Sequence, residues 1–348
     1  MMRVSGTLIP IAKYPAFTAE ETEAILKSIV PAERWELFMK DQAIDLSYAH
    51  GTEARFRVNG YRVQGAVALA LRLIPHAVRT FTELNLPSTL EVFTQREQGF
   101  FLVVGPVGQG KSTTLAAMIE RINESRSEHI LTIEDPVEYI FTPKKSLIHQ
   151  REVHIDTPDF KDALQGSFRE DVDVIMVGEM RDYETISSAV TAAETGHLVF
   201  STLHTNDAAS AIARLLDMGV ESFLLSSTIR GILAQRLVRI ICPRCKEIIS
   251  SPGNGGGQIP AAEGGLPVFA GRGCEHCAHT GYHGRMGIFE LISIDDPIRK
   301  LIVDRAAVND IEEAARMNGM KTLFEDGLEK VKTGITTIAE LLRVTQEA

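Results

Sequence analysis

The pattern of apolar and polar positions divides the chain into two regions. In the first region, Thr18-Ala19-Glu20-Glu21 is a capping box that predicts the start of a helix, and Pro31–Lys40 predicts a second helix. Apolar and polar residues then alternate over residues 54–58 and 66–74, which is typical of strands with one buried face. Helices combined with such strands predict a small α+β domain over residues 1–95.

In the second region, short apolar segments alternate with segments of helical periodicity. The apolar segments have the composition of buried strands, and they are Phe100–Val104, Ile130–Glu134, Val174–Val177 and Leu198–Thr202. Strands that alternate with helices predict a parallel sheet covered by helices on both faces. We therefore predict an α/β domain over residues 96–348.

A glycine-rich segment follows the first of these strands and has the spacing G-x-x-x-x-G-K-S, which is typical of a phosphate-binding P-loop. Glycines let consecutive backbone N–H groups turn toward phosphate oxygens. Lys111 adds a positive charge near the β- and γ-phosphates, and the Ser112 hydroxyl is a ligand for Mg²⁺. The predicted strand before the segment and a predicted helix over residues 113–122 supply the context that the motif requires. The predicted nucleotide-binding residues are Gly105, Pro106, Val107, Gly108, Gln109, Gly110, Lys111, Ser112 and Thr113.

Charged and polar side chains follow the other three predicted strands. Because ligands of parallel sheets bind beyond the carboxyl ends of the strands, we expect these side chains to lie at the same edge as the P-loop. Glu179 is predicted to polarise a water molecule or to hold the Mg²⁺ shell, and His204 to sense the γ-phosphate. Gly178 stands where an aspartate usually precedes such a glutamate, so another acid is expected to fill that role. A helix N-cap is the alternative for any one of these residues. The predicted catalytic residues are Glu134, Asp135, Glu138, Glu179, Arg181 and His204.

The four cysteines form two C-x-x-C pairs, Cys242 with Cys245 and Cys274 with Cys277. Two such pairs supply four thiolates, which predicts a structural Zn²⁺ site in a subdomain over about residues 240–290. The segment Ser250–Gly265 between the pairs is glycine-rich and polar, so it cannot form a core, and the metal would hold its base. Four thiols without a metal are the alternative.

Length, charge and hydropathy exclude several classes of protein. The 348 residues, 44% of them hydrophobic, suffice for two domains. A net charge of −10 argues against a protein that coats nucleic acid, so no nucleic-acid partner is expected. There is no apolar run of about 18 residues, and the N-terminus lacks the apolar core of a signal peptide. These features predict a cytoplasmic location.

Four motifs in this order resemble the secretion ATPases of type II secretion and type IV pilus machines, which have an assembly branch (PilB/GspE) and a retraction branch (PilT). Beside the P-loop, Ile133–Tyr139 is similar to the family's Asp box, and Asp173–Asp182 to its atypical Walker B segment. Ala193–His197 and Ser201–Thr205 are similar to its His box. The resemblance implies a hexameric ring of RecA-like domains that hydrolyse Mg-ATP, each preceded by a PAS-like domain. It also implies an inner-membrane platform protein as a partner, and thus a peripheral position at the inner face of the plasma membrane.

The same resemblance bears on the N-terminal region. It implies that Arg55, Arg57 and Arg72 lie where the N-terminal domain offers arginines to the phosphates of ATP. Ordinary exposed strand arginines are the alternative. Asn59-Gly60 is a dipeptide typical of tight hairpin turns, whereas the resemblance favours a continuous strand there.

The resemblance does not decide the direction of action. The four cysteines are similar to the assembly branch, whereas the short N-terminus is similar to the retraction branch. Pilus assembly, pilus retraction in twitching motility, and type II secretion therefore stay open. A RecA-like DNA-uptake or conjugation ATPase is one alternative, and a nucleotide-gated structural module without useful turnover is another. Val107 and Gln109 replace a threonine and a serine that are common in the family's P-loop.

Overall fold

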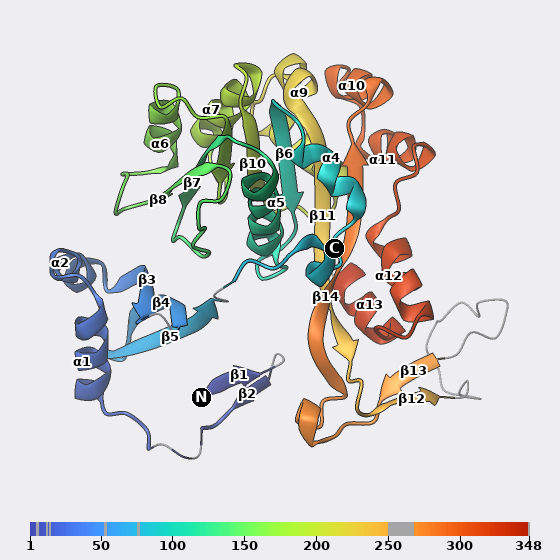
Figure 1. Ribbon diagram of the computed structural model, residues 1–348. Coiled ribbons are helices and arrows are strands. Elements are labelled where there is room, and N and C mark those ends of the chain that lie inside the picture. The colour runs from blue at the N-terminus through green and yellow to red at the C-terminus, as the bar shows by residue number, and fades with distance from the viewer. Residues whose placement is uncertain are drawn as a thin grey trace.

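The computed structural model describes residues 1–4, 7–11, 13, 15–51, 54–74, 77–249 and 268–346. Within these residues, a seven-stranded sheet covered by helices forms the larger part, and a three-stranded sheet with two helices precedes it in the chain (Figure 1). The fold is α/β with a mostly parallel central sheet, as the sequence predicts. The glycine-rich segment Ser250–Gly265, expected to lack a core, lies outside the described residues.

The smaller part contains the helices and strands that the N-terminal pattern predicts. The capping box at Thr18 and Glu21 is present, with Glu21 N–H donating to Thr18 Oγ1 at 3.2 Å and Thr18 N–H donating to Glu21 Oε2 at 2.8 Å. Its relation to PAS domains stays a prediction. The elements are β1 (Met2–Val4), β2 (Thr7–Ile9), α1 (Ala19–Ile29), α2 (Ala32–Asp41), β3 (Ala43–His50), β4 (Ala54–Val63) and β5 (Ala66–Ile74), of which β3, β4 and β5 pair antiparallel.

Asn59-Gly60 lies in the middle of β4 and does not form a turn. The chain turns instead at Gln64 and Gly65, where φ is 51° and 84°. Gly60 lets Leu26 of α1 pack closely onto the strand: a Cβ atom at this position would lie 2.6 Å from Leu26 Cδ1, so the leucine would have to shift. The dipeptide thus reflects helix-on-sheet packing, and the continuous strand is confirmed.

The central sheet has the strand order β14-β11-β6-β10-β9-β7-β8. The four predicted strands are all present and mutually parallel, and β14 runs antiparallel to β11. Sequence reasoning did not predict β8, β11 or β14. The strands are β6 (Gly99–Val104), β7 (His129–Glu134), β8 (Leu147–Glu152), β9 (Val174–Val177), β10 (Leu198–Leu203), β11 (Ile229–Ile241) and β14 (Tyr282–Ser293).

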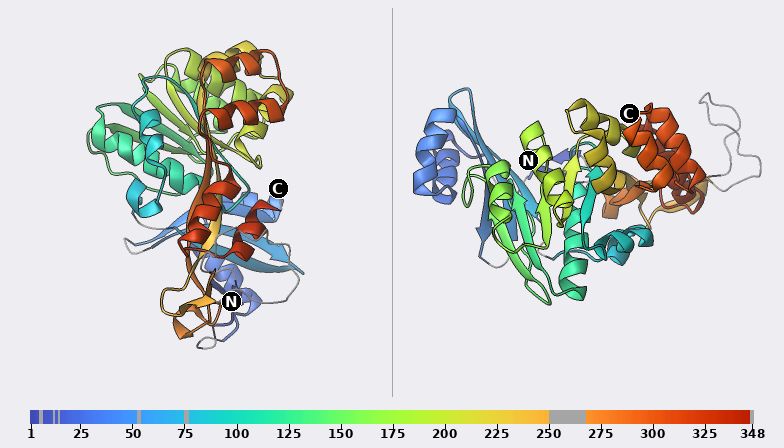
Figure 2. Two further views of the ribbon diagram at one scale, coloured as in Figure 1. Left: turned by 90° about the vertical axis from the view of Figure 1, so that its right-hand side faces the viewer. Right: turned by 90° about the horizontal axis from the view of Figure 1, so that it is seen from above.

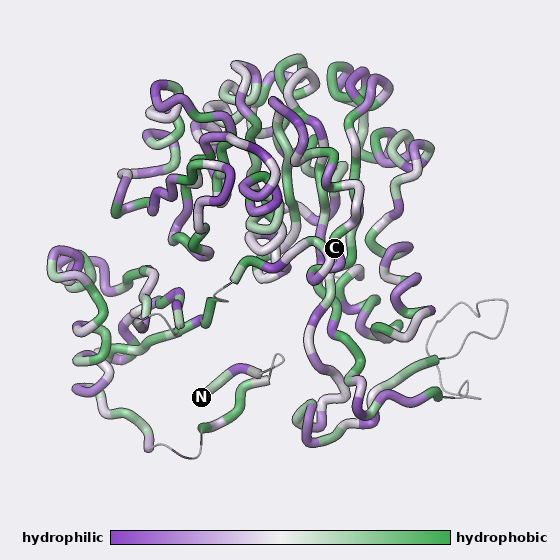
Figure 3. The backbone as a smooth tube through the Cα atoms, viewed as in Figure 1, coloured by the Kyte–Doolittle hydropathy of each residue, from purple (hydrophilic) through white to green (hydrophobic). Residues whose placement is uncertain are grey.

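Alternate residues of the central strands face two helical layers, because successive side chains of a strand point to opposite sides. Phe101 and Val103 of β6 face one layer, whereas Phe100 and Leu102 face the other. Figure 3 shows mostly apolar residues along these central strands and a mixture of polar and apolar residues along the helices around them. The first layer is α3 (Phe81–Leu84), η1 (Ser88–Leu90), α4 (Glu91–Thr94) and α5 (Lys111–Ser125). The second includes α6 (Phe160–Ser167), α7 (Tyr183–Glu194), α8 (Ala208–Asp217), α9 (Ser222–Thr228), α10 (Asp296–Val303) and α11 (Val308–Met317).

Beyond the central sheet, β11 and β14 continue as a two-stranded ladder that leads to the four cysteines. Figures 1 and 2 show β12 and β13 at the far end of this ladder, away from the helices that cover the sheet. The remaining elements are β12 (Lys246–Ile249), β13 (Val268–Gly271), η2 (Glu275–Cys277), α12 (Leu323–Lys332) and α13 (Ile338–Thr345). None of the helices in the described ranges is both long enough and apolar enough to cross a membrane.

Candidate functional site

The glycine-rich loop connects the carboxyl end of β6 to the first turn of α5. Gly105 has φ of 147°, and a Cβ atom there would lie 2.5 Å from the carbonyl oxygen of Gln235 on β11. Gly110 is the N-cap of α5 in the left-handed conformation, and no side chain caps this helix. The first N–H groups of α5 are therefore available to an anion, which the helix dipole also attracts.

Lys111 opens α5 and folds back over the loop. Its Nζ donates to the carbonyl oxygens of Gly105 at 2.7 Å and Pro106 at 3.0 Å, and lies 3.4 Å from His204 Nδ1. Burial lowers the pKa of Lys111 to about 8, although the nearby Glu179 carboxylate raises it. The ammonium group is thus held at the mouth of the loop by weak acceptors that a stronger anion can replace.

His204, after β10, connects Lys111 to Glu179, after β9. A protonated lysine only donates, so Nδ1 of His204 is the acceptor and its Nε2 carries the proton. That nitrogen lies 3.3 Å from Glu179 Oε2, and Arg181 Nη2 donates to Glu179 Oε1 at 2.5 Å. The Arg181 side chain is 70% exposed, whereas that of Glu179 is 18% exposed. A cation, an imidazole and a carboxylate therefore stand in one row at this edge of the sheet.

Glu134 ends β7 and is buried next to Gly178. It accepts hydrogen bonds from Thr132 Oγ1 at 2.9 Å and from the backbone N–H of Glu138 at 3.2 Å. Burial raises its pKa to about 7, although these hydrogen bonds act in the opposite direction. A Cβ atom at Gly178 would approach Glu134 Cα to 3.5 Å, so the missing aspartate's position adjoins this acid. Asp135 is half-buried beside it.

Two of the three predicted N-terminal arginines reach the same edge. Arg57 of β4 lies 3.7 Å from Glu138 Oε1, and Arg55 Nη2 donates to the carbonyl oxygen of Val137 at 3.3 Å. Arg72 is paired with Arg57 in the strand register and is exposed. The structure therefore brings Arg55 and Arg57 to the acids after β7, and it places Arg72 on the neighbouring strand.

Sequence reasoning missed the residues of β11 that hold the loop. Gln235 Nε2 donates to the carbonyl oxygen of Gln109 at 2.7 Å, and its Oε1 accepts from Thr114 Oγ1 at 2.7 Å. Arg236, 3% exposed, donates through Nη2 to the carbonyl oxygen of Asn206 at 2.7 Å. The available signal was two adjacent polar residues between the apolar segments Ile232–Ala234 and Leu237–Val238 of β11, because buried polar groups need partners.

Sequence reasoning also missed two residues on the opposite side of the loop. Tyr139 Oη lies 2.9 Å from Thr113 Oγ1, which joins the segment after β7 to the first turn of α5. Glu152 ends β8, and its side chain is 7% exposed. Its Oε2 accepts from the backbone N–H of Val137 at 3.1 Å.

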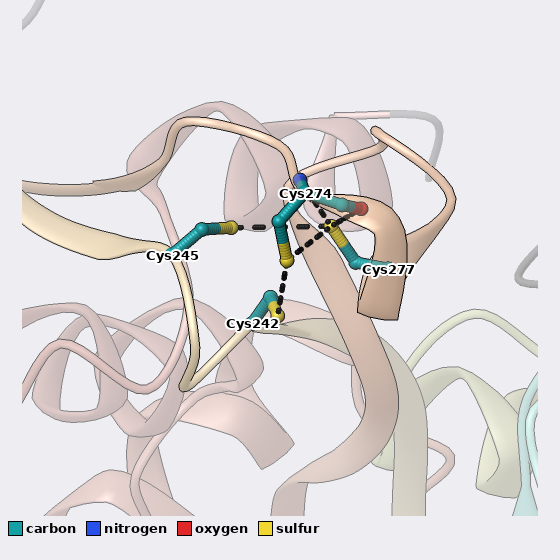
Figure 4. Close-up of side chains that lie close together, drawn as sticks. All are labelled: Cys242, Cys245, Cys274 and Cys277. Carbon is teal, nitrogen blue, oxygen red and sulfur yellow. Dashed lines mark hydrogen bonds between the residues drawn. The ribbon is translucent and has the colours of Figure 1, made fainter.

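The four cysteines converge at the end of the β11–β14 ladder (Figure 4). The Sγ atoms of Cys242 and Cys274 lie 3.9 Å apart, those of Cys245 and Cys277 3.9 Å, and those of Cys274 and Cys277 3.8 Å. A tetrahedral ion with Zn–S bonds of about 2.3 Å needs sulfur atoms about 3.8 Å apart. The geometry of the four thiols therefore fits zinc.

The fold and this edge define an α/β protein with a mostly parallel sheet and a glycine-rich, anion-attracting loop at its carboxyl ends. Residues 19–343 match the family described as Type II/IV secretion system protein, and the chain belongs to this family. The resemblance noted in the sequence is thus confirmed.

Two relatives and one solved structure illustrate the membership. The chain is 48% identical over 259 residues to the type II secretion system protein HxcR of Pseudomonas aeruginosa, covering 74% of this chain and 51% of the relative. It is 45% identical over 268 residues to the type IV pilus assembly ATPase PilB of Thermus thermophilus, covering 75% of this chain and 30% of the relative. The crystal structure of the pilus retraction motor PilT with bound ADP is 35% identical and has a TM-score of 0.77, covering 98% of this chain and 89% of that chain.

These matches show a family that contains ATPases. The chain spans about half the length of the first relative and less of the second. The activity, substrate and partners of the whole protein therefore belong to the proposal that follows.

Proposed function

We propose that this chain binds and hydrolyses Mg-ATP and acts as the motor of a type IV pilus or type II secretion machine. The observation that carries the proposal is the row of Lys111, His204 and Glu179 at the mouth of the glycine-rich loop. Phosphoryl transfer to water needs little covalent chemistry from the protein. It needs a cation on the phosphates, a carboxylate that orients water, and donors for the charge that develops. Lys111 and Glu179 of this row supply the first two, and the uncapped N–H groups of α5 supply the donors.

When ATP binds, Lys111 exchanges weak hydrogen-bond acceptors for stronger ones. The ammonium group of Lys111 leaves the carbonyl oxygens of Gly105 and Pro106 for the phosphate oxygens, which also accept from the first N–H groups of α5. The exposed Ser112 hydroxyl is the proposed Mg²⁺ ligand, and the ion neutralises charge on the β- and γ-phosphates. Arg55, Arg57 and Arg72 approach the phosphates from the N-terminal region, with Arg57 now paired to Glu138.

Hydrolysis then requires a positioned water molecule. Glu179 orients it, His204 reports the γ-phosphate to Glu179, and Arg181 balances the carboxylate charge. An aspartate is usual at the position of Gly178. We propose that its role is taken by Glu134, Asp135 and Glu138. The pKa of Glu134 near 7 suits a group that exchanges a proton at neutral pH.

The resemblance to the family supports a proposal for the larger assembly. We infer a homo-hexameric ring of RecA-like domains, each with its PAS-like N-terminal domain, bound to an inner-membrane platform protein at the cytoplasmic face. ATP closes the interface between the domains, and product release reopens it. Assembly, retraction and secretion are alternative outputs of this motor.

We also propose a structural zinc site formed by Cys242, Cys245, Cys274 and Cys277. When bound, zinc supplies four bonds to thiolates in a closed, non-catalytic site. Backbone N–H groups of Gly273 and Cys274 donate to Cys245 Sγ at 3.3 Å and Cys277 Sγ at 3.2 Å, which favours the thiolate form.

The test of the motor is phosphate release from ATP by the full chain over a range of protein concentrations. We expect turnover that rises cooperatively with concentration and disappears in Lys111→Ala. Lys144→Ala is the matched control, because Lys144 pairs with Glu120 and Glu124 away from the loop. ATP binding without turnover at any concentration would favour the nucleotide-gated module. Stimulation by DNA would favour the DNA-uptake or conjugation ATPase.

A further inference from the structure

Glu152 is a buried carboxylate with partners in both parts of the chain. It ends β8, and its Oε2 accepts from the backbone N–H of Val137 at 3.1 Å. The same oxygen accepts from the Ser47 hydroxyl of β3 at 3.1 Å and lies 3.9 Å from Arg55 Nη2 of β4. One carboxylate oxygen thus joins the three-stranded sheet to the segment after β7.

These contacts close into a ring. Arg55 Nη2 donates to the Ser47 hydroxyl at 3.0 Å and to the carbonyl oxygen of Val137 at 3.3 Å. Ser47 and Val137 each donate in turn to Glu152. Every member therefore fixes the next, and Arg55 is held through a single nitrogen. Its Nε is buried and has no hydrogen-bond partner among the described residues, so the guanidinium retains donor capacity.

Glu152 sets the geometry of this ring because it belongs to a strand that is held rigidly in the central sheet. The strand β8 pairs with β7 along six consecutive residues, ending at Glu134 opposite Glu152. A buried carboxylate is stable only with partners in fixed places. The partners of Oε2 come from one sheet, Ser47 of β3 and Arg55 of β4, and from the segment after β7 that contains Val137. Loss of its charge would weaken the hydrogen bond from Ser47 and the ion pair with Arg55, and Arg55 would keep only its bond to the Val137 carbonyl across this junction.

We propose that Glu152 is a positioning residue for the nucleotide site. It holds the face of the three-stranded sheet that carries Arg55 and Arg57 against the segment that carries Glu138. It thereby determines where these arginines meet the phosphates, and so contributes to ATP affinity without touching ATP. This inference rests on the proposed function, because a positioned arginine matters only if a nucleotide binds.

The test compares the full chain with Glu152→Gln, which keeps the size of the side chain and removes its charge. Glu170→Gln is the matched control, because Glu170 also pairs with an arginine of β8, Arg151, at 2.9 Å, but contacts neither β3 nor β4 in the described structure. Hydrogen–deuterium exchange of β3 and β4 is measured without nucleotide. The dissociation constant of a fluorescent ATP analogue and the thermal unfolding temperature are measured in parallel.

We expect Glu152→Gln to speed exchange in β3 and β4 and to weaken analogue binding at least about threefold, because a charge-assisted contact is lost. Ser47→Ala, which removes the hydroxyl between Arg55 and Glu152, should act in the same direction with a smaller effect. Glu170→Gln should change neither quantity.

The outcomes separate this inference from the proposed function. Unchanged exchange in Glu152→Gln would overturn the inference, and so would faster exchange with unchanged affinity, which would leave Glu152 a structural role only. A wild-type chain that does not bind the analogue would refute the proposed function and, with it, the effect on affinity. The rate of hydrogen–deuterium exchange in β3 and β4 would then decide separately whether Glu152 joins the two sheets.

Discussion

Gln109 Oε1 accepts a hydrogen bond from the backbone N–H of Leu237 at 2.7 Å, so a side chain of the glycine-rich loop is bound to β11. The backbone carbonyl of the same residue accepts from Gln235 Nε2 at 2.7 Å. Two bonds through one residue fix the loop beside the strand, at a position where the resemblance to the family implies a serine. The variable position of the motif therefore carries a specific contact in this chain.

The first prediction concerns this contact. Gln109→Ser should weaken ATP binding about fivefold, because a serine hydroxyl is too short to reach Leu237 and a net contribution of about 1 kcal/mol is lost. Binding of a fluorescent ATP analogue measures the change. Gln98→Ser is the control for the same substitution, since Gln98 is exposed just before β6 and outside the loop. Equal losses in the two variants would show that the bond to Leu237 has no special role.

The second prediction concerns the pH dependence of binding. Burial lowers the pKa of Lys111 to about 8, so the free protein loses this positive charge above pH 8. Phosphates favour the charged form, so binding above that pH takes up a proton. Affinity for ATP should then fall by up to about tenfold per pH unit between pH 8 and pH 9.5. Titration calorimetry in buffers of different ionisation enthalpy measures both the affinity and the proton uptake.

Lys111→Arg is the control for that titration, because a guanidinium stays charged throughout this range. Its affinity is expected to be lower at neutral pH and nearly constant up to pH 9.5. A wild-type affinity that is equally constant would contradict the assignment of Lys111 as the phosphate cation.

The third prediction concerns Glu179. Glu179→Gln should still bind ATP and should hydrolyse it at least about tenfold more slowly, because an amide orients water but does not polarise it as a carboxylate does. Single-turnover phosphate release separates the two steps. Glu184→Gln, an exposed acid in the first turn of α7, should retain normal turnover. Near wild-type turnover of Glu179→Gln would reject the assignment.

The fourth prediction concerns the cysteines. The purified chain should contain about one Zn²⁺, and Cys242→Ser should lose it, because three thiolates no longer close the tetrahedral site. Elemental analysis measures the metal directly. Absence of zinc from both proteins would leave the alternative of four thiols without a metal.

The fifth prediction concerns stability and Glu340 of α13, which is 1% exposed. Its Oε2 accepts from Arg239 Nη2 at 2.8 Å, and its Oε1 accepts from Arg343 Nη2 at 2.6 Å. Burial alone would raise the pKa of Glu340, but the hydrogen bonds from Arg343 and Arg239 outweigh it and lower the pKa to about 2. The carboxylate therefore stabilises the fold above its ordinary pKa of 4.5, and this contribution is lost as the pH falls toward 2.

Glu340→Gln should accordingly reduce the free energy of unfolding by about 2 kcal/mol at pH 7, with a smaller difference at pH 3. Urea unfolding at the two pH values measures this change. Glu329→Gln is the control, because Glu329 pairs with Lys321 at the surface. A difference between wild type and Glu340→Gln that does not depend on pH would contradict the ionic role of Glu340.

Several features could be predicted because they depend on neighbours in the chain. The helix α5 buries Leu115, Met118 and Ile122 as its periodicity predicts. Backbone preference and the periodicity of burial extend over a few residues. Such patterns can therefore be recognised without knowing which distant segment packs against them. The same locality explains an ambiguity: Asp182 and Asp207 also come after the predicted strands, and each is the N-cap of a helix, α7 or α8.

Other features depended on which strands pair and in what register. Local pattern predicted four central strands but not β8, whose sequence Leu-Ile-His-Gln-Arg-Glu is largely polar and which forms the edge of the sheet. It also missed β14, which returns antiparallel to β11 after the cysteines. The edge position of β8 and the antiparallel pairing of β14 are properties of the assembled sheet. The local sequence pattern therefore indicates them only weakly.

The sequence by itself determined the glycine-rich loop, the acids and histidine that follow the strands, and the spacing of the four cysteines. The tertiary structure decided which of these residues meet and which others support them. Ser47 and Glu152 are 105 positions apart, and Gln109 and Leu237 are 128 positions apart, yet each pair shares a hydrogen bond. Such pairs form because strand order and register bring distant segments together, and a buried polar group then binds whichever partner the fold places within reach.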